Sequence, residues 1–257
     1  MKTPTKSLAP LTIPRGPRTN TPTLLAVAHG SRNPAARESV EALLAEVHRQ
    51  RPGITALGCY LDHSEPLLRD VVRTLSGPAV AVPLLLTAAF HTGVDLPHQL
   101  AAAPVPVEQA DALGPDPLLL RGLERRLAEV GVASGDPDTA VVLTAAGSSD
   151  PSAVTSVAAL ARRLAADGWW DVTAAYASAA SPSPAEAVAD LRRRGAPRVA
   201  VASYLLSPGL FADTCHDAGA DVVSAPLGDA PEVAAVVLAR YDDACARLAV
   251  GSDGPRR

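Results

Sequence analysis

Short apolar runs alternate with longer segments of helical periodicity along most of this chain. Residues 24–28 are five consecutive apolar residues, a pattern typical of a strand that is buried on both faces. The next segment starts at Pro34 and repeats apolar residues at i, i+3 and i+7, namely Val40, Leu43 and Val47. This spacing puts them on one face of a helix, so the chain begins with a strand followed by a helix.

The rest of the chain repeats this unit. Further strands are predicted at residues 54–61, 79–86, 104–107, 140–144, 171–177, 198–205 and 221–224. Helices are predicted at residues 66–75, 96–103, 117–130 and 231–248, with another that starts at Pro151. Pro104 and Pro106 have no N–H to donate to a ladder, so the strand that contains them is expected at the edge of its sheet.

Three landmarks occur twice and in the same order. The turn Gly30-Ser31-Arg32-Asn33-Pro34 corresponds to Gly147-Ser148-Ser149-Asp150-Pro151, residues 60–66 correspond to 176–182, and residues 84–87 correspond to 204–207. In both turns an Asn or Asp precedes a proline, a combination that caps a helix and begins it. The chain is therefore expected to contain an internal duplication, with the turn-rich residues 134–138 between the two copies.

The duplication predicts an α/β fold of two similar domains. Each is expected to be a four-stranded, mainly parallel sheet flanked by helices, in the strand order 2-1-3-4, and the two should face each other across a cleft. We expect the first domain at residues 23–133 and the second at 138–250. Residues 1–22, rich in Thr, Pro and basic residues, and residues 251–257 are expected to be tails, the first of them flexible.

Composition narrows the range of partners. The chain has 257 residues, of which 47% are hydrophobic and 19% charged, as in globular proteins. A net charge of −4 gives no reason to expect nucleic acid as a partner, and no apolar run is long enough to cross a membrane. The three cysteines form no Cys-x-x-Cys motif, so neither a disulfide framework nor a zinc knuckle is predicted. We expect a soluble cytoplasmic protein, either a monomer or a homodimer.

The duplication also helps to separate structure from function, because features of one copy alone are candidates for chemistry. Three polar residues follow the first three strands of the first copy and are absent from the second. They are His29, Asp62 and His91, against Ala146, Ser178 and Phe211 in the second copy. In the strand order 2-1-3-4 the three side chains leave adjacent strands at one edge of the sheet. Two imidazoles and a carboxylate suit a borderline divalent metal ion, or proton abstraction near neutral pH.

Other interpretations of these residues are open. His29 can instead cap the turn that follows it, and Asp62 can cap the next helix. His63 is adjacent to Asp62 and can join the cluster, whereas Glu65 suits a charge at the start of a helix. Cys215 precedes a histidine, but neighbours in sequence rarely share a helix face, so we interpret that pair as structural.

Taken together, the motifs resemble those of the sirohydrochlorin chelatases, which insert Fe²⁺ or Co²⁺ into sirohydrochlorin. The resemblance covers about residues 23–248, including the duplication. It rests on His29-Gly30-Ser31 after the first strand and on a Leu-acid-x-x-x-Pro element that contains Asp62. The third motif is x-x-His-x-x-x-Asp-Leu-Pro, which contains His91.

The resemblance implies a chelatase without an organic cofactor, which inserts a divalent ion into a tetrapyrrole in siroheme or cobalamin biosynthesis. Between the two ions we favour Fe²⁺ over Co²⁺. His29 and His91 would be the pair that handles the metal and accepts protons. Asp62 stands where the family usually has Glu, and it is shorter by one methylene. The turns of both copies are expected to bind the substrate's carboxylates through backbone N–H groups and a guanidinium. These substrate-binding residues are Gly30, Ser31, Arg32, Gly147 and Ser148.

Two further functions compete with this interpretation. A protein that binds a tetrapyrrole or a metal ion without turnover fits the same residues if Asp62 cannot replace Glu. A histidine phosphatase also uses a His-Gly pair, but it needs an arginine immediately before the histidine, where this chain has Ala28. The sequence has no Walker loop, no Gly-x-Gly-x-x-Gly and no Gly-x-Ser-x-Gly element, which argues against nucleotide and serine-hydrolase chemistry.

Overall fold

The computed structural model describes residues 21–87 and 95–252, which alternate between strands and helices. The first half contains β1 (Thr23–Ala28), α1 (Pro34–Gln50), β2 (Ala56–Tyr60), α2 (Leu68–Arg73), β3 (Ala79–Pro83), α4 (Asp95–Leu100), β4 (Val107–Gln109) and α5 (Pro117–Glu129). The second half contains β5 (Thr139–Ala145), α6 (Pro151–Ala165), β6 (Asp171–Tyr176), α7 (Pro184–Arg193), β7 (Arg198–Tyr204), α8 (Leu210–His216), β8 (Val222–Val223) and α9 (Pro231–Ser252).

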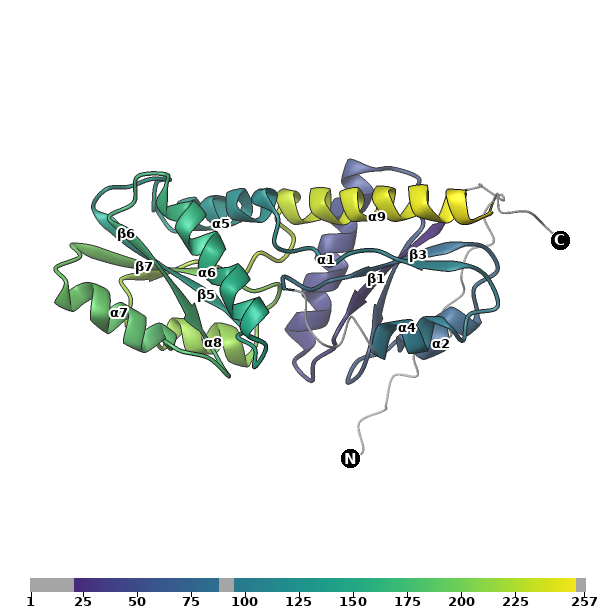
Figure 1. Cartoon of the computed structure of the whole chain (residues 1–257), viewed down its shortest axis with the longest axis horizontal. Helices are drawn as coiled ribbons and strands as arrows, with labels where there is room; N and C mark the ends of the chain where they lie inside the picture. The colour runs from purple at the N-terminus through teal and green to yellow at the C-terminus, as the bar shows by residue number, and fades with distance from the viewer. Residues whose placement is uncertain (1–20, 88–94, 253–257) are drawn as a thin grey trace, which may run out of the picture.

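The strands form two parallel sheets of four strands each, and helices flank both sheets (Figure 1). The orders are β2-β1-β3-β4 and β6-β5-β7-β8, so the predicted 2-1-3-4 order is confirmed in both copies. The edge strand of the first sheet starts at Val107, later than predicted. The prolines at 104 and 106 precede it because they cannot donate ladder hydrogen bonds.

Both central strands lead into a helix through the same capped turn. The side chain of Asn33 accepts a hydrogen bond from the Ala35 N–H at 3.0 Å and so caps α1. Asp150 caps α6 in the same way, with the Ser152 N–H at 2.8 Å. A proline follows each cap at the first helical position, where its missing N–H costs nothing. The repeated turn therefore starts a capped helix directly after the carboxyl end of each central strand.

The last helix of each copy packs on the sheet of the other copy. Helix α5 belongs to the first copy by sequence but contacts β7, whereas α9 belongs to the second copy and contacts β3, β4 and α1. In Figure 1, α5 lies above the second sheet and α9, in yellow, lies above the first. One buried apolar cluster accordingly spans both halves and contains Leu24 as well as Leu143. The domain boundaries expected from the sequence describe the two sequence repeats and stay a prediction. They do not separate the packed units, because each sheet is covered by a helix from the other repeat.

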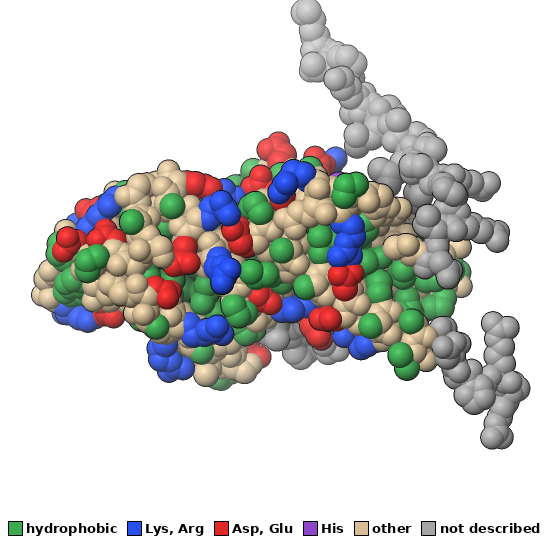
Figure 2. Space-filling view, turned by 90° about the horizontal axis from the view of Figure 1, so that it is seen from above, with side chains coloured by type: hydrophobic (Ala, Val, Ile, Leu, Met, Phe, Trp, Pro, Cys, Tyr) green, Lys and Arg blue, Asp and Glu red, His purple; other side chains and the backbone are tan. Residues whose placement is uncertain are grey.

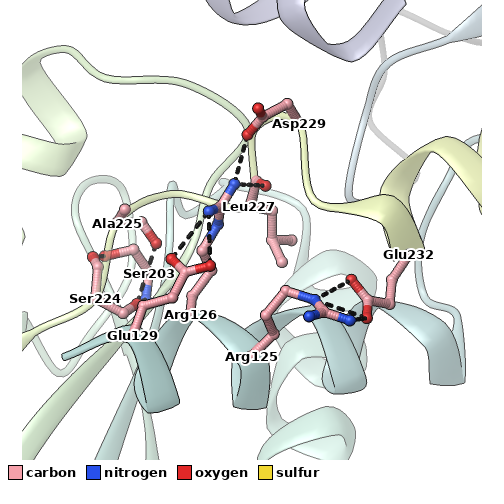
Figure 3. A network of polar contacts seen from close by, with 9 residues as sticks. All are labelled: Arg125, Arg126, Glu129, Ser203, Ser224, Ala225, Leu227, Asp229 and Glu232. Atoms are coloured by element: carbon pink, nitrogen blue, oxygen red, sulfur yellow. Dashed lines mark hydrogen bonds and ion pairs between the residues drawn. The ribbon is translucent and has the colours of Figure 1, made fainter. Parts of the chain in front are cut away.

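Charged side chains join the exchanged helices to their surroundings. Basic and acidic side chains alternate on the face that α5 and α9 cover (Figure 2). Arg125 of α5 pairs with Glu232 of α9 at 2.5 Å. The neighbouring Arg126 is mostly buried and donates to the Leu227 carbonyl at 3.0 Å and to Asp229 at 2.7 Å (Figure 3). These contacts fix α5 to the chain segment that leads into α9.

Candidate active site

A cavity of about 420 Å³ lies between the two halves, at the carboxyl ends of strands from both sheets. Residues 29–31, which follow β1, line it together with the equivalent residues 146–148, which follow β5. The segments after β3 and β7 complete the lining. Ligands of α/β proteins bind at this end of the strands, so the predicted cleft between the copies is present.

The lining of the cavity is mostly apolar and comes from both halves. Leu84 and Leu85 belong to the first half, and Leu206, Leu210 and Phe211 belong to the second. The last two are among the most exposed large apolar residues of the described chain, with Leu210 78% and Phe211 38% exposed. Because exposed apolar side chains at a cavity often mark a binding surface, this rim is suited to a flat apolar ligand.

One hydrogen bond crosses between the halves beside the cavity. The Tyr204 hydroxyl, at the end of β7, donates to the Leu86 carbonyl at 2.9 Å. Tyr204 is 1% exposed, and burial raises its pKa, so the hydroxyl stays protonated as a donor. The bond therefore ties the segment after β3 to the sheet of the second half.

The Gly30 turn and the Gly147 turn have the same backbone construction. Both glycines have positive φ, +97° and +92°. A Cβ at Gly30 would lie 1.7 Å from the Asp62 carbonyl oxygen, and a Cβ at Gly147 would lie 1.8 Å from that of Ser178. Only glycine fits at either place. The close approach also brings the loop after β2 against the turn after β1.

The serines of these turns act in helix capping. The Ser31 hydroxyl oxygen accepts from the Asn33 N–H at 3.1 Å, and Ser148 accepts from the Asp150 N–H at 3.0 Å. The Ser31 N–H itself donates to the Ser64 hydroxyl oxygen at 3.1 Å. This N–H is therefore already used within the protein. The exposed Arg32 is the charged group of the turn that faces solvent.

His29 and Asp62 meet at the carboxyl ends of β1 and β2. His29 is exposed and lines the cavity, and its carbonyl accepts from the Asp62 N–H at 3.0 Å. The Asp62 side chain is 66% exposed and accepts from the His63 N–H at 2.8 Å. This hydrogen bond and the charge of the His63 ring hold the pKa of Asp62 below its usual range, and the charge of His29 acts in the same direction. Asp62 is therefore an ionised carboxylate beside the cavity.

The capping role considered for Asp62 is wrong. Helix α2 begins at Leu68, and its N-cap is Leu67, which makes no side-chain capping bond. The loop after β2 is too long for Asp62 to reach the start of the helix. Its carboxylate caps the backbone of its own loop instead.

The structure adds His63 to the pair. Its ring centre lies 6.2 Å from that of His29, with the rings 78° apart, and its Nε2 lies 3.7 Å from Asp62 Oδ2. The sequence left open whether His63 joins the cluster. Its orientation depends on a left-handed backbone, with a φ of +60° at His63, which the pattern of residues does not predict. The usable signal was its absence from the second copy, where Ala179 stands.

Several predicted or considered residues do not reach this cluster or cannot be assessed. His91 lies outside the described residues, so its predicted role stays a prediction. Among the described residues, no group of three or more His, Cys, Asp or Glu is arranged to hold a metal ion. Cys215 is buried and His216 is exposed on α8, in agreement with a structural role for the pair. A further histidine of the first half, His98, is exposed on α4 and does not line the cavity.

Comparison with known proteins identifies the family. The CbiX family model matches residues 23–130 and matches again at residues 140–244. The chain belongs to the CbiX family. The double match coincides with the internal duplication, so each copy of this CbiX chain is a CbiX unit in its own right.

Curated relatives of this CbiX chain are named sirohydrochlorin cobaltochelatases. One from Methanosarcina barkeri (strain Fusaro / DSM 804) is 27% identical over 122 residues, which is 41% of this chain and 94% of the relative. Another from Priestia megaterium is 25% identical over 205 residues, which is 73% of this chain and 65% of the relative. The chain thus spans slightly less than two thirds of the second relative.

Solved structures share the fold of this CbiX chain. SirB from Bacillus subtilis with Fe³⁺ has a TM-score of 0.73 at 23% identity, with 89% of this chain and 97% of that chain covered. A CbiX described as the terminal enzyme for biosynthesis of siroheme in denitrifying bacteria has a TM-score of 0.65 at 24% identity, with 86% and 99% covered. The two-sheet architecture with its duplicated copies is therefore that of known chelatases.

Proposed function

We propose that this protein inserts a divalent metal ion, Fe²⁺ or Co²⁺, into sirohydrochlorin. The observation that carries the proposal is the one-sided site: His29 lines an apolar cavity between the copies, and the ionised Asp62 bonds the His29 carbonyl through its own N–H. The second copy has Ala146 and Ser178 instead. Membership of the CbiX family and relatives named sirohydrochlorin cobaltochelatase support the choice of substrate.

The cavity suits the faces of a tetrapyrrole. Leucines after β3 and β7, together with Phe211, offer apolar surface to the macrocycle. The ring's carboxylates then extend toward the rim and the solvent. Arg32, in the turn before α1, is exposed and follows the lining residue Ser31, and it carries the positive charge that a carboxylate needs. Gly30 and the Gly147–Ser148 turn stay the proposed backbone contacts.

Insertion exchanges two pyrrole protons for one divalent cation. In the proposed reaction the His29 imidazole, whose ordinary pKa lies near neutral pH, accepts a proton from a pyrrole N–H and passes it to water. The Asp62 carboxylate attracts the incoming cation. His91 is proposed as the second imidazole that handles the ion and a proton. Few strong ligands in an open site allow the ion to leave for the macrocycle nitrogens.

The physiological metal is part of the same proposal, and we favour Fe²⁺ over Co²⁺. Both ions are borderline acids that take imidazole and carboxylate ligands, so one site serves either. We further propose a cytoplasmic monomer or homodimer that needs no organic cofactor. The three cysteines, Cys59, Cys215 and Cys245, are unpaired, as is common in a reducing compartment. The described part of the chain has no helix long and apolar enough to cross a membrane.

An absorbance assay tests the proposal directly. Purified protein is mixed with sirohydrochlorin and with Fe²⁺, Co²⁺ or Ni²⁺ in separate reactions, and the spectrum of the macrocycle is followed against a protein-free control. Faster insertion of Fe²⁺ or Co²⁺ than in the control is expected. Binding of sirohydrochlorin without any acceleration would instead support a protein that binds the tetrapyrrole and does not turn it over.

Variants of the same assay assign the residues. His29→Ala and His91→Ala are each expected to abolish the acceleration, because each removes an imidazole that handles the ion. Asp62→Ala is expected to lower the rate, and Asp62→Glu to restore it, since the longer acid keeps the charge. Full activity of Asp62→Ala would reduce Asp62 to a residue that shapes its loop.

A further inference from the structure

We propose that His63 is a ligand of the incoming divalent cation and shares that ion with His29. The inference rests on the proposed function in one respect: the ion that His63 binds is the ion later inserted into sirohydrochlorin. It assigns the loop after β2 a second metal-handling side chain beside Asp62. Binding is reversible coordination, so no bond of the protein is made or broken apart from those to the ion.

The His63 side chain is not needed to build its loop. The backbone of this loop is repeated in the second copy, where the Ala180 N–H donates to the Ser178 carbonyl at 2.7 Å, as the Ser64 N–H does to Asp62 at 2.7 Å. Ala179 has a φ of +55° there, against +60° at His63. An alanine thus sustains the same left-handed conformation, and the imidazole is an addition of the copy that also holds His29.

The separation of the two rings fits a shared ion. A metal ion about 2.1 Å from a ring nitrogen lies about 3.2 Å from the ring centre, so two rings that share one ion have centres about 5.2 Å apart at a tetrahedral angle and at most about 6.4 Å apart. The His29 and His63 centres are 6.2 Å apart, so a movement of about 1 Å brings both rings onto one tetrahedral ion. The two rings make an edge-to-face contact, with their planes 78° apart, and both side chains are exposed and can turn toward an ion.

Asp62 supplies a carboxylate at the same point. Its Oδ2 lies 3.7 Å from His63 Nε2, too long for a hydrogen bond and close to the separation of two ligands on one ion. Its other oxygen accepts from the His63 N–H, which holds the carboxylate against the ring. A small rotation of these exposed side chains, 42% exposed for His63 and 66% for Asp62, brings both onto an ion.

The described side chains offer the cation an incomplete set of ligands. An incomplete set suits a site that binds the ion and then releases it to the macrocycle. The described side chains are not preset as a three-ligand metal site, so the ion gains only part of its ligands from the protein. The remaining positions stay with water or pass to the macrocycle nitrogens. Both side chains of the loop are exposed, so a hydrated ion has access to them from solvent.

Titration with Co²⁺ in the absence of sirohydrochlorin tests the inference. The full-length wild type, His63→Ala, His29→Ala and the double variant are titrated by calorimetry and by the visible absorption of bound Co²⁺. Ala179 predicts that His63→Ala folds. His48→Ala is the matched control, because His48 is an exposed histidine of α1 that bonds the Leu44 carbonyl at 2.7 Å.

We expect His63→Ala and His29→Ala each to weaken Co²⁺ binding at least about tenfold, since loss of even an outer partner of a ligand costs that much. The double variant should lose less than the product of the two single losses, because both act on one ion. His48→Ala should bind as the wild type does. Wild-type affinity in His63→Ala, or no Co²⁺ binding by the wild type, overturns the inference.

Steady-state kinetics of insertion provide a second measurement, because a purely structural role of His63 would not change the KM for the metal ion alone. His63→Ala should raise the KM for the metal ion and leave the KM for sirohydrochlorin unchanged. An unchanged KM for the metal contradicts the inference as well. If the wild type captures Co²⁺ through His63 but accelerates no insertion, the proposed function fails and the capture site stands.

Discussion

Arg126 and Arg240 occupy equivalent positions in the two copies, and each binds the loop of the other copy. Both follow a Leu-Gly pair, at 113–114 and 227–228, by the same number of residues. Arg126 donates to the Leu227 carbonyl at 3.0 Å, and Arg240 donates to the Leu113 carbonyl at 3.1 Å. The exchange of α5 and α9 is thus locked by two reciprocal contacts of the same kind.

This lock predicts a loss of stability when either arginine is removed. Arg240 also bonds Asp116 at 3.0 Å and is mostly buried, so Arg240→Ala removes this ion pair and the hydrogen bonds to the Ala112 and Leu113 carbonyls. We expect a loss of about 3 kcal/mol in the free energy of unfolding and a fall in Tm of roughly 6–12 °C. Arg162→Ala, at an exposed position on α6, should change stability by less than about 0.5 kcal/mol. Equal melting of the two variants contradicts the lock.

A pair of glycine variants tests whether the metal site is confined to the first copy, which holds His29, Asp62 and His63. Gly30→Ala and Gly147→Ala meet the same clash with a loop carbonyl, so each should destabilise the protein by about 2 kcal/mol or more. Only Gly30→Ala displaces the loop of Asp62 and His63 and should weaken Co²⁺ binding. Calorimetric unfolding and metal titration of both variants check this. Equal loss of metal binding in both would contradict a site confined to the first copy.

Phe211 is predicted to bind the macrocycle. It lines the cavity from the second copy, at the position that corresponds to His91. Phe211→Ala should raise the Kd for metal-free sirohydrochlorin about tenfold, because stacking and burial of the ring are lost, and leave Co²⁺ binding unchanged. Quenching of the macrocycle's fluorescence measures this. Val250→Ala, an exposed apolar residue on α9, is the control, and an unchanged Kd in Phe211→Ala rules out the contact.

The pair between α5 and α9 predicts a pH dependence of stability. The hydrogen bond from Arg125 holds the pKa of Glu232 below its usual range. A group with a lowered folded pKa stabilises the protein fully above its unfolded pKa, near 4.3, and loses this effect as the pH falls through the folded pKa. Glu232→Gln should therefore cost about 1 kcal/mol at pH 7 and progressively less below pH 4. Denaturant unfolding of the wild type and of Glu232→Gln, at pH 7 and below pH 4, measures the difference in their free energies of unfolding. A difference that grows in acid contradicts a stabilising Arg125–Glu232 pair.

The layout of the sheets could be predicted from the sequence because it depends on local pattern. Apolar runs defined the central strands, and the capped turns at Asn33 and Asp150 defined the helices that follow them. The duplication then gave the strand order twice over. It also identified which residues lack a counterpart, and of these His29 and Asp62 lie side by side, with His29 in the lining of the cavity. Their roles stay predictions.

Two features needed three-dimensional information. The apolar stripe of α5 predicts that one face of the helix is buried, but it does not identify the sheet against which that face packs. The exchange of α5 and α9 between the sheets was therefore not predicted. The orientation of His63 depends on a left-handed φ that a non-glycine residue rarely adopts. Tertiary packing decided both.

The helix exchange also orders events during synthesis of the chain. The sheet that carries His29 is translated before the second sheet, but α9, which covers it, is translated after both. Chains generally fold from the N-terminus as they are made, yet here the first sheet keeps an apolar face uncovered until the end. The second half, in contrast, finds its covering helix α5 already present. The half that carries the proposed chemistry is therefore the first to be made and the last to be completed.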